Sequence, residues 1–387
     1  MRTLITAAAA LVACAAITCT APPARAATIT VDWAGSGDYT SIGEGLAAGS
    51  PGDTILVLPG TYGGPENNEL SFGGKDMVLR SADGLGSVAI DHYSQFAPVF
   101  HIHDGETRGA VVDGFTVSGA SAWCTIPVLD IHDASPTIRN CRFSGNRAAG
   151  GHHTEGWCGV GSFYRSGGAL IDCVMQSNSA HCGIGALGIV ESSVDIENCS
   201  FVHSWDEWEG VGALYIRDSG PVAITGCLFV RNMGQESCIY ASGSSSLTIE
   251  NCTFVDNGGS YWGVETSGAV IGSYGPAPIL VRDCIFAFNR IDGIMADPDH
   301  ATVAWCCVYG NACGDTLTGN YVPDRIIWED PLFCNWEAGD YMLCSDSPCL
   351  PSASGWGAVV GAYDEGCGAC GSAVETISWG RIKAMYR

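Results

Sequence analysis

The sequence is short of charge, and above all of positive charge. Only 15% of the 387 residues are charged, and 17 lysines and arginines stand against 41 aspartates and glutamates, a formal net charge of −24 at pH 7. A surface of this charge repels nucleic acids and anionic membranes, and it attracts cations and neutral ligands. We therefore expect no nucleic-acid partner, and pectate or alginate would need a bridging calcium ion.

Long apolar runs are also lacking after the N-terminus. Residues 1–26 combine an early arginine, an apolar run and the ending Ala24-Arg25-Ala26, which is typical of a cleaved export signal. Leu11-Val12-Ala13-Cys14 resembles a lipoprotein cleavage box, so a lipid anchor at Cys14 stays open as an alternative. No later segment approaches the ~18 apolar residues of a membrane helix. We expect a secreted or cell-surface protein without a transmembrane helix.

Helical periodicity is scarce too, and it is confined to "YTSIGEGLAAG" (39–49). What the sequence has instead is glycine, 52 residues of it, and a short pattern that recurs from residue 109 onward. The copies align on a cysteine, and six of seven have an asparagine five residues later, Ser204 being the exception. The aligned cysteines are Cys141, Cys173, Cys199, Cys227, Cys252, Cys284 and Cys306. Self-similarity at this period is the signature of a solenoid.

Each copy holds a second β-rich segment ahead of its cysteine, as at Gly161-Ser162-Phe163 and Gly212-Ala213-Leu214. Short strands separated by Gly/Ser/Asn turns predict a coiled parallel sheet, with the segment 39–49 as a helical cap over the first coil. The cysteines would then form a ladder of buried, reduced thiols, and the asparagines a ladder of side-chain amides bonded from coil to coil.

The opening "GDYTSIGEGLAAGSPGDTILVLPGTY" (37–62), followed by such coils, resembles right-handed parallel β-helix proteins of the pectate-lyase-like superfamily. The F-x-x-N repeats, such as Phe143 to Asn146, also look like those of polymorphic outer-membrane adhesins. The resemblance implies an all-β chain: a single right-handed parallel β-helix over residues 27–365 with a short N-terminal capping helix. It says little about activity, because this fold hosts lyases, hydrolases, epimerases and adhesins. Residues 366–387 would form a cysteine-containing segment and a basic tail.

The loops between each asparagine and the next strand collect aromatic, acidic and histidine residues, most densely in "VHSWDEWEG" (202–210). The β-rich segment that follows each loop has an alanine or an equivalent residue near its start, as in Gly212-Ala213-Leu214. Counting back five residues from that position aligns Trp123, Trp157, His181, Trp208 and Met233. This alignment predicts one file, a row of equivalent residues in successive coils, along an edge of the solenoid. Exposed aromatic rings stack on sugars, whose hydroxyls bind carboxylates and histidines. The expected substrate-binding residues are Trp123, Trp157, Trp205, Trp208, Tyr261, Trp262, His153 and Glu265. The alternative is that the tryptophans pack under the loops.

The same edge offers candidates for catalysis. Asp206, Glu209 and Glu155 supply carboxylates that glycoside hydrolysis needs in pairs, and His181 is a candidate base for lyase chemistry. Signature motifs of pectinases and polygalacturonases are missing or misplaced, so catalysis stays an open question. We expect no metal ligand set and no cofactor, with calcium as the alternative on so acidic a surface.

The remaining cysteines gather near the C-terminus: Cys334, Cys344, Cys349, Cys367 and Cys370. Export favours disulfides there, and a zinc site built on "CGAC" (367–370) is the alternative. Cys124, Cys158 and Cys182 share one slot in successive coils, so a neighbouring pair could be bridged. The sequence thus predicts an exported monomer that binds an extracellular polysaccharide or cell-surface glycan and cleaves it if the edge is catalytic. A non-catalytic adhesin or structural solenoid is the alternative.

Overall fold

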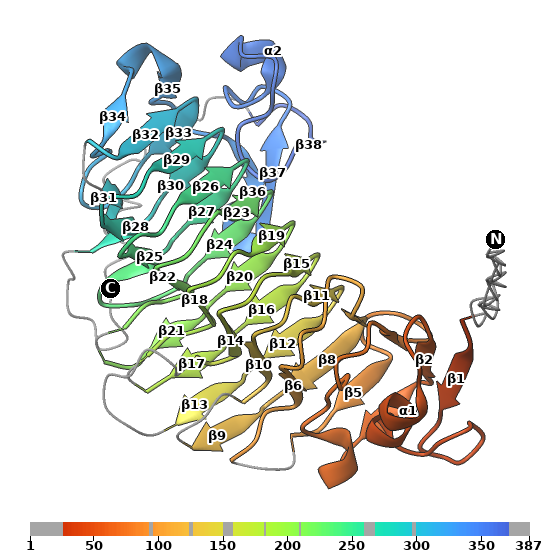
Figure 1. Ribbon diagram of the computed structural model, residues 1–387. Coiled ribbons are helices and arrows are strands. Elements are labelled where there is room, and N and C mark those ends of the chain that lie inside the picture. Colours follow the sequence, from red (N-terminus) through yellow and green to blue (C-terminus); the bar gives the residue numbers. More distant parts are fainter. Residues whose placement is uncertain are drawn as a thin grey trace, which may run out of the picture.

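The computed structural model describes residues 26–92, 96–123, 127–149, 158–181, 183–208, 210–258, 268–295 and 299–370. Within these ranges the chain winds into an elongated solenoid (Figure 1) whose coils contribute one strand to each of three long parallel sheets. Some coils add a strand to a short fourth sheet. The predicted coiled parallel sheet is confirmed.

Four parallel sheets run along the solenoid. The twelve-stranded sheet contains β1 (Thr28–Val31), β2 (Thr54–Val57), β4 (Val78–Ser81), β7 (Val111–Asp113), β11 (Thr137–Arg139), β15 (Ala169–Ile171), β19 (Asp195–Glu197), β23 (Val222–Thr225), β26 (Leu247–Glu250), β29 (Ile279–Arg282), β32 (Ala301–Ala304) and β34 (Asn320–Tyr321). The eleven-stranded sheet contains β3 (Gly60–Tyr62), β5 (Val88–Ile90), β8 (Phe115–Ser118), β12 (Arg142–Ser144), β16 (Val174–Gln176), β20 (Ser200–Val202), β24 (Leu228–Val230), β27 (Thr253–Val255), β30 (Ile285–Ala287), β33 (Cys306–Tyr309) and β35 (Ile326–Ile327). The eight-stranded sheet contains β6 (Phe100–Ile102), β10 (Leu129–His132), β14 (Gly161–Tyr164), β18 (Leu187–Val190), β22 (Leu214–Arg217), β25 (Ser237–Ser242), β28 (Ala269–Tyr274) and β31 (Asp292–Met295). The four-stranded sheet contains β9 (Ser121–Trp123), β13 (Arg147–Ala149), β17 (Ser179–Ala180) and β21 (Trp205–Asp206).

A single residue with positive φ turns the chain from the twelve-stranded to the eleven-stranded sheet. Asn140, Asp172, Asn198, Asn251 and Asp283 adopt φ values of 50° to 53°, each directly before a ladder cysteine. Asparagine and aspartate tolerate this left-handed conformation better than other residues with a Cβ. The Asn/Asp-Cys pairs of the repeat are therefore corners followed by an inward-facing cysteine.

The predicted cysteine ladder lies inside the solenoid, where all seven thiols are buried. The backbone N–H of Cys173 donates to Sγ of Cys199 at 3.4 Å, and Cys199 and Cys227 continue the same pattern along the axis. Two residues after five of the seven cysteines a phenylalanine ring also points inward, with Met175 and Val308 in the other two coils. Phe201, Phe229, Phe254 and Phe286 stack with ring centroids 4.8 Å apart. The F-x-x-N repeat thus marks a column of packed rings.

The asparagine ladder is confirmed as well. Oδ1 of Asn257 accepts the backbone N–H of Asn232 at 3.0 Å, while its Nδ2 donates to the carbonyl of Phe229 at 2.8 Å. The ladder asparagines are buried, so these bonds satisfy backbone groups that water cannot reach. Ser204 interrupts the ladder, and its buried Oγ has no hydrogen-bond partner among the described residues.

The N-terminal end is closed by helix α1 (Ile42–Ala48), as predicted. Ser41 caps the helix: its Oγ accepts the backbone N–H of Glu44, whose carboxylate accepts from the same hydroxyl. Ile42 and Leu46 are buried over the first coil. The other short helices are the 3-10 helices η1 (Pro65–Asn67), η2 (Pro323–Arg325) and η3 (Trp336–Ala338), and α2 (Pro351–Ser354). In the part of the chain that the structure describes, no helix is long and apolar enough to cross a membrane.

The coils end near β35, earlier than the expected boundary at residue 365. The chain then forms a three-stranded sheet of β36 (Phe333–Asn335), β37 (Asp340–Cys344) and β38 (Glu365–Cys367). This sheet packs beside the eleven-stranded sheet, where Tyr341 and Leu343 share an apolar cluster with outward-facing Val230 and Val255. The segment folds back because these outward positions are apolar and need cover.

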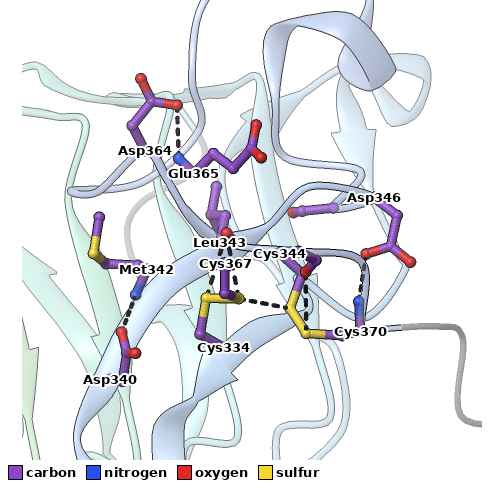
Figure 2. The surroundings of a disulfide bond; sticks show 12 residues. Cys334, Asp340, Met342, Leu343, Cys344, Asp346, Asp364, Glu365, Cys367 and Cys370 are labelled. Atoms are coloured by element: carbon purple, nitrogen blue, oxygen red, sulfur yellow. Dashed lines mark hydrogen bonds between the residues drawn. A yellow bond between two sulfur atoms is a disulfide. The ribbon is translucent and has the colours of Figure 1, made fainter.

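Two disulfides hold this C-terminal sheet together (Figure 2). Cys334 pairs with Cys367 and Cys344 with Cys370, at Cα separations of 6.1 and 5.7 Å. The predicted disulfides are formed, and these sulfurs are therefore not available as zinc ligands. Cys349 and Cys158 are buried free thiols, while Cys124, Cys182, Cys14 and the predicted export signal up to residue 25 lie outside the described residues.

Candidate functional site

The edge predicted from the sequence is the four-stranded sheet with the residues that follow its strands. Of the expected site residues, Trp123, His181, Trp205, Asp206 and Trp208 are described. The others lie outside the described residues: His153, Glu155, Trp157, Glu209, Tyr261, Trp262 and Glu265.

The predicted single file is wrong in register. Trp123 pairs with Ala149, whereas Met233 pairs with Trp205, and Trp208 follows β21 outside any strand. The error arises because the prediction counted backward across loops that differ in length from coil to coil. Counting forward from the asparagine ladder, which is in register, places each residue in its proper file.

Asp206 has a buried carboxylate and not the solvent-facing one expected for catalysis. Asp206 pairs with Ala180 on the neighbouring strand, and Ala148 and Ala122 continue the same row of paired residues. All four side chains are buried, because side chains alternate between the two faces of a strand and this row faces inward. Its Oδ2 accepts the backbone N–H of Gly183 at 2.6 Å, and its Oδ1 those of Trp208 and Gly210 at 2.8 and 2.7 Å. Burial raises the pKa of the Asp206 carboxyl, although these amide donors act in the opposite direction. The contacts give Asp206 a structural role: it shapes the loop that carries Trp208.

Glu207, next along the chain, faces outward and joins three coils. Its carboxylate lies 2.9 Å from Nη2 of Arg147, and its Oε2 lies 2.8 Å from Nδ1 of His181. When Nδ1–H donates to the carboxylate, Nε2 of the imidazole is left as the proton acceptor. His181 therefore has the geometry of an oriented base, with Glu207 as its positioning residue.

The two tryptophans at the ends of this edge are exposed. Trp123 and Trp208 each expose 56% of their surface, and the Trp208 ring meets the His181 ring edge-on at 5.9 Å. Trp205 is half-buried, with its ring 5.4 Å from that of His203. The alternative that the tryptophans pack beneath the loops does not hold for Trp123 and Trp208.

A second cluster of functional side chains, on the outward face of the eight-stranded sheet, was missed by the sequence analysis. His101 on β6 pairs with Asp130 on β10, and their side chains approach to 3.4 Å between Nε2 and Oδ2. The Nε2 atoms of His101 and His132 are 3.3 Å apart, and the ring of His103 lies 4.0 Å from that of His101. Burial lowers the pKa of His101, while the nearby Asp130 carboxylate acts against this shift.

A signal for this cluster was present in the sequence. The tripeptide Ile-His-Asp occurs at 102–104 and again at 131–133, and the two isoleucines pair in register on β6 and β10. A repeated tripeptide on neighbouring coils stacks its histidines, since equivalent positions of successive coils lie one strand spacing apart. The repeat falls in the strands ahead of the cysteine column, at the polar positions that alternate with the buried isoleucines.

Further along the same face, Tyr215, Tyr240 and Tyr274 form a stack with ring centroids 5.7 and 5.4 Å apart. Each ring covers its neighbour's face, so the stack presents mainly ring edges and hydroxyls to solvent. Burial raises the pKa of Tyr215 and of Tyr240. The stack suits packing between coils better than sugar stacking.

Comparisons with known proteins concern the fold. A family model described as a right handed beta helix region matches residues 128–304. No curated protein matches the chain. Solved structures that are similar include a pectin methylesterase from carrot, at 12% identity over 85% of this chain and 94% of that chain with a TM-score of 0.34. Another is a mannuronic acid specific polysaccharide family 6 lyase from human gut microbiota, at 12% identity over 78% and 80% of the two chains with a TM-score of 0.35. The parallel sheets, whose strands follow one another in chain order, show that the chain is a parallel β-helix, and the family match over residues 128–304 agrees with a right-handed one.

Proposed function

We propose that the chain binds a neutral extracellular polysaccharide or cell-surface glycan along its four-stranded edge. The residues of this edge strip are Trp123, Arg147, His181, Trp205, Glu207 and Trp208. The observation that carries the proposal is the exposure of Trp123 and Trp208 at the two ends of one small sheet. The strip spans four coils, roughly 14 Å at about 4.8 Å a step. An extended ligand lying along the solenoid axis would reach both rings.

The groups between the tryptophans support the same ligand class. Arg147 and His181 both contact the Glu207 carboxylate, so the three side chains are oriented before a ligand arrives. Sugar hydroxyls bind well to such fixed charged groups, while the apolar C–H faces of sugars pack on indole rings. Preorganisation lowers the entropic cost of binding.

Net charge selects among glycans. With a formal charge of −24, the chain repels a polyanion at long range, and the single arginine of the strip is already paired with Glu207. A neutral glycan meets no such barrier. Export, which the N-terminal segment predicts, would place the protein where such glycans occur.

Glycan-array binding tests the proposal with the wild type and a Trp123→Ala/Trp208→Ala double variant. We expect the wild type to bind at least one neutral glycan, and the double variant to lose about tenfold or more of that affinity, because each indole contact contributes about 1 kcal/mol. Trp328→Ala is the matched control, since Trp328 is exposed but lies far along the chain from the strip. Equal binding by wild type and double variant would contradict the proposal and favour a structural solenoid.

Cleavage of the bound glycan is a second candidate function, favoured by the contact between His181 and Glu207. A base oriented by a carboxylate is the arrangement that general base catalysis uses. If the strip is catalytic, reducing-sugar release from a bound glycan falls by about 10²-fold or more in His181→Ala, and Glu207→Gln also lowers it while binding persists. Binding without any release by the wild type would leave the strip a binding surface only.

A further inference from the structure

The histidine cluster on the eight-stranded sheet has the spacing of a metal site. Nε2 of His101 lies 3.3 Å from Nε2 of His132 and 3.4 Å from Oδ2 of Asp130, and the ligand atoms of the three residues lie within 4.8 Å of one another. Zinc binds imidazole nitrogen and carboxylate oxygen at about 2.0–2.1 Å, so two ligand atoms of a tetrahedral site are about 3.3–3.4 Å apart. The two shortest separations in the cluster match this value.

Carboxylates lie beside the Nδ1 atoms of two histidines in the cluster. His132 Nδ1 faces Oδ2 of Asp133 at 3.8 Å, without a direct hydrogen bond, and the same oxygen accepts a 2.7 Å hydrogen bond from Arg165. His103 Nδ1 lies 3.3 Å from Asp104 Oδ2, and the His103 ring packs against both of the other histidine rings. A carboxylate beside Nδ1 favours the tautomer whose Nε2 is free to bind a metal.

The position on the sheet makes the cluster rigid. His101 and Asp130 lie on paired parallel strands, and Ile102 and Ile131 between the cluster residues are fully buried. Side chains on paired strands keep their separation without a loop having to close, which limits the conformational entropy lost on metal binding. The three side chains are partly exposed, so a metal can enter from solvent.

We propose that His101, Asp130 and His132 bind one divalent transition metal ion, with zinc as the best fit to the ligand set. Imidazole ligands favour zinc, copper and nickel over calcium, which prefers six to eight oxygens. Three protein ligands leave the fourth coordination position of the metal open to water or to a bound small molecule. The site is independent of the edge strip, since it lies on a different sheet and shares no residue with the strip.

The test is zinc titration by calorimetry of the full chain, purified without a histidine tag and stripped with EDTA. We expect one zinc per chain and at least tenfold weaker binding by both Asp130→Asn and His132→Gln. His92→Gln is the control, because His92 lies outside the cluster and its Nε2 contacts the carbonyl of Ala97; its zinc affinity stays at the wild-type value. Excess calcium does not displace the zinc.

Thermal unfolding provides the second readout. Zinc that binds the folded chain but not the unfolded chain raises the melting temperature. We expect this rise to disappear in Asp130→Asn and His132→Gln, while their melting temperatures without zinc stay close to that of the wild type. Cobalt in place of zinc gives the visible absorption of a tetrahedral site. Zinc uptake that is absent, or equal in wild type and cluster variants, overturns the proposal whatever the glycan array shows, as does displacement of zinc by calcium.

Discussion

Nδ1 of His181 lies 2.8 Å from Oε2 of Glu207, although the two residues belong to successive coils and are separated by 26 positions in the sequence. Arg147, one coil earlier than His181, reaches the same carboxylate at 2.9 Å. A single glutamate thus ties three coils together on the surface of the four-stranded edge.

The Arg147–Glu207 pair is expected to contribute little to stability. The arginine side chain is 46% exposed, so water screens the attraction, and a double-mutant cycle with Arg147→Ala and Glu207→Gln should give a coupling of about 0.5–1 kcal/mol. Urea unfolding of the wild type, both single variants and the double variant measures it. A coupling of several kcal/mol would mean that the edge is drier than the exposed arginine indicates.

Asp206→Asn should lower the stability of the fold far more than Glu207→Gln does. Asparagine can offer only one oxygen to the three backbone N–H groups that the carboxylate accepts, and its NH2 group would face a donor. We expect the free energy of unfolding to fall by about 3 kcal/mol. Asp195→Asn is the control, because Asp195 lies on the surface beside Arg108 and should cost under about 1 kcal/mol. Equal losses in denaturant unfolding would rule out the structural role of Asp206.

Ser204→Asn should stabilise the protein, which is uncommon for a substitution in a packed interior. Ser204 occupies an asparagine position of the ladder, and within the part of the chain that the structure describes its buried hydroxyl has no hydrogen-bond partner. An asparagine there can bond to the preceding coil as Asn232 and Asn257 do, adding about 1 kcal/mol. Ser204→Ala separates this gain from simple removal of the hydroxyl. A lower melting temperature for Ser204→Asn than for Ser204→Ala would show that the site cannot accept the larger amide.

The ladder cysteines should not react with alkylating reagents in the folded protein. All seven ladder thiols are closed to solvent. Burial raises the pKa of the ladder thiols Cys141 and Cys173, and raises the pKa of Cys158, a buried thiol outside the ladder, to about 12, so these three stay protonated at about pH 8. Burial also acts to raise the pKa of Cys227, but its hydrogen bonds with Cys199 and Cys252 lower it, so this thiol is protected by its inaccessibility alone. Among the described free cysteines Cys313 is the exposed one. Iodoacetamide should therefore label Cys313 first, as read by peptide mass spectrometry.

Unfolding in denaturant supplies the control for this labelling, since all free thiols then react. Labelling of Cys227 or Cys252 in the native protein at the rate of Cys313 would contradict a continuous buried ladder.

Local chemistry made much of the fold predictable. Cysteine and phenylalanine at alternate positions place an apolar column inward, Asn or Asp before the cysteine supplies the left-handed corner, and the asparagine five residues after the cysteine satisfies buried backbone groups. Each of these rules acts within a few residues and recurs in most coils, with exceptions such as Ser204, Met175 and Gly226. One sequence therefore carries several independent indications of the same solenoid.

The positions of the edge residues relative to one another depend on the lengths of the loops, which differ from coil to coil and do not follow from the repeat. Trp123 and Trp208 are exposed as expected, but the files they belong to follow from strand pairing, and Asp206 proved to lie in the inward file of Ala148 and Ala180. A shift of one residue in a strand moves a side chain to the opposite face. Counting along variable loops cannot resolve such a shift.

By itself, the sequence determined the winding of the chain, the buried ladders and the helical cap, because these depend on contacts between equivalent positions of a repeat. Only the tertiary structure decided which acidic side chain faces water, that the C-terminal sheet folds back along the solenoid, and that His101, Asp130 and His132 meet. These contacts join side chains from neighbouring coils, and the distance between their atoms depends on both the strand register and the direction in which each side chain points.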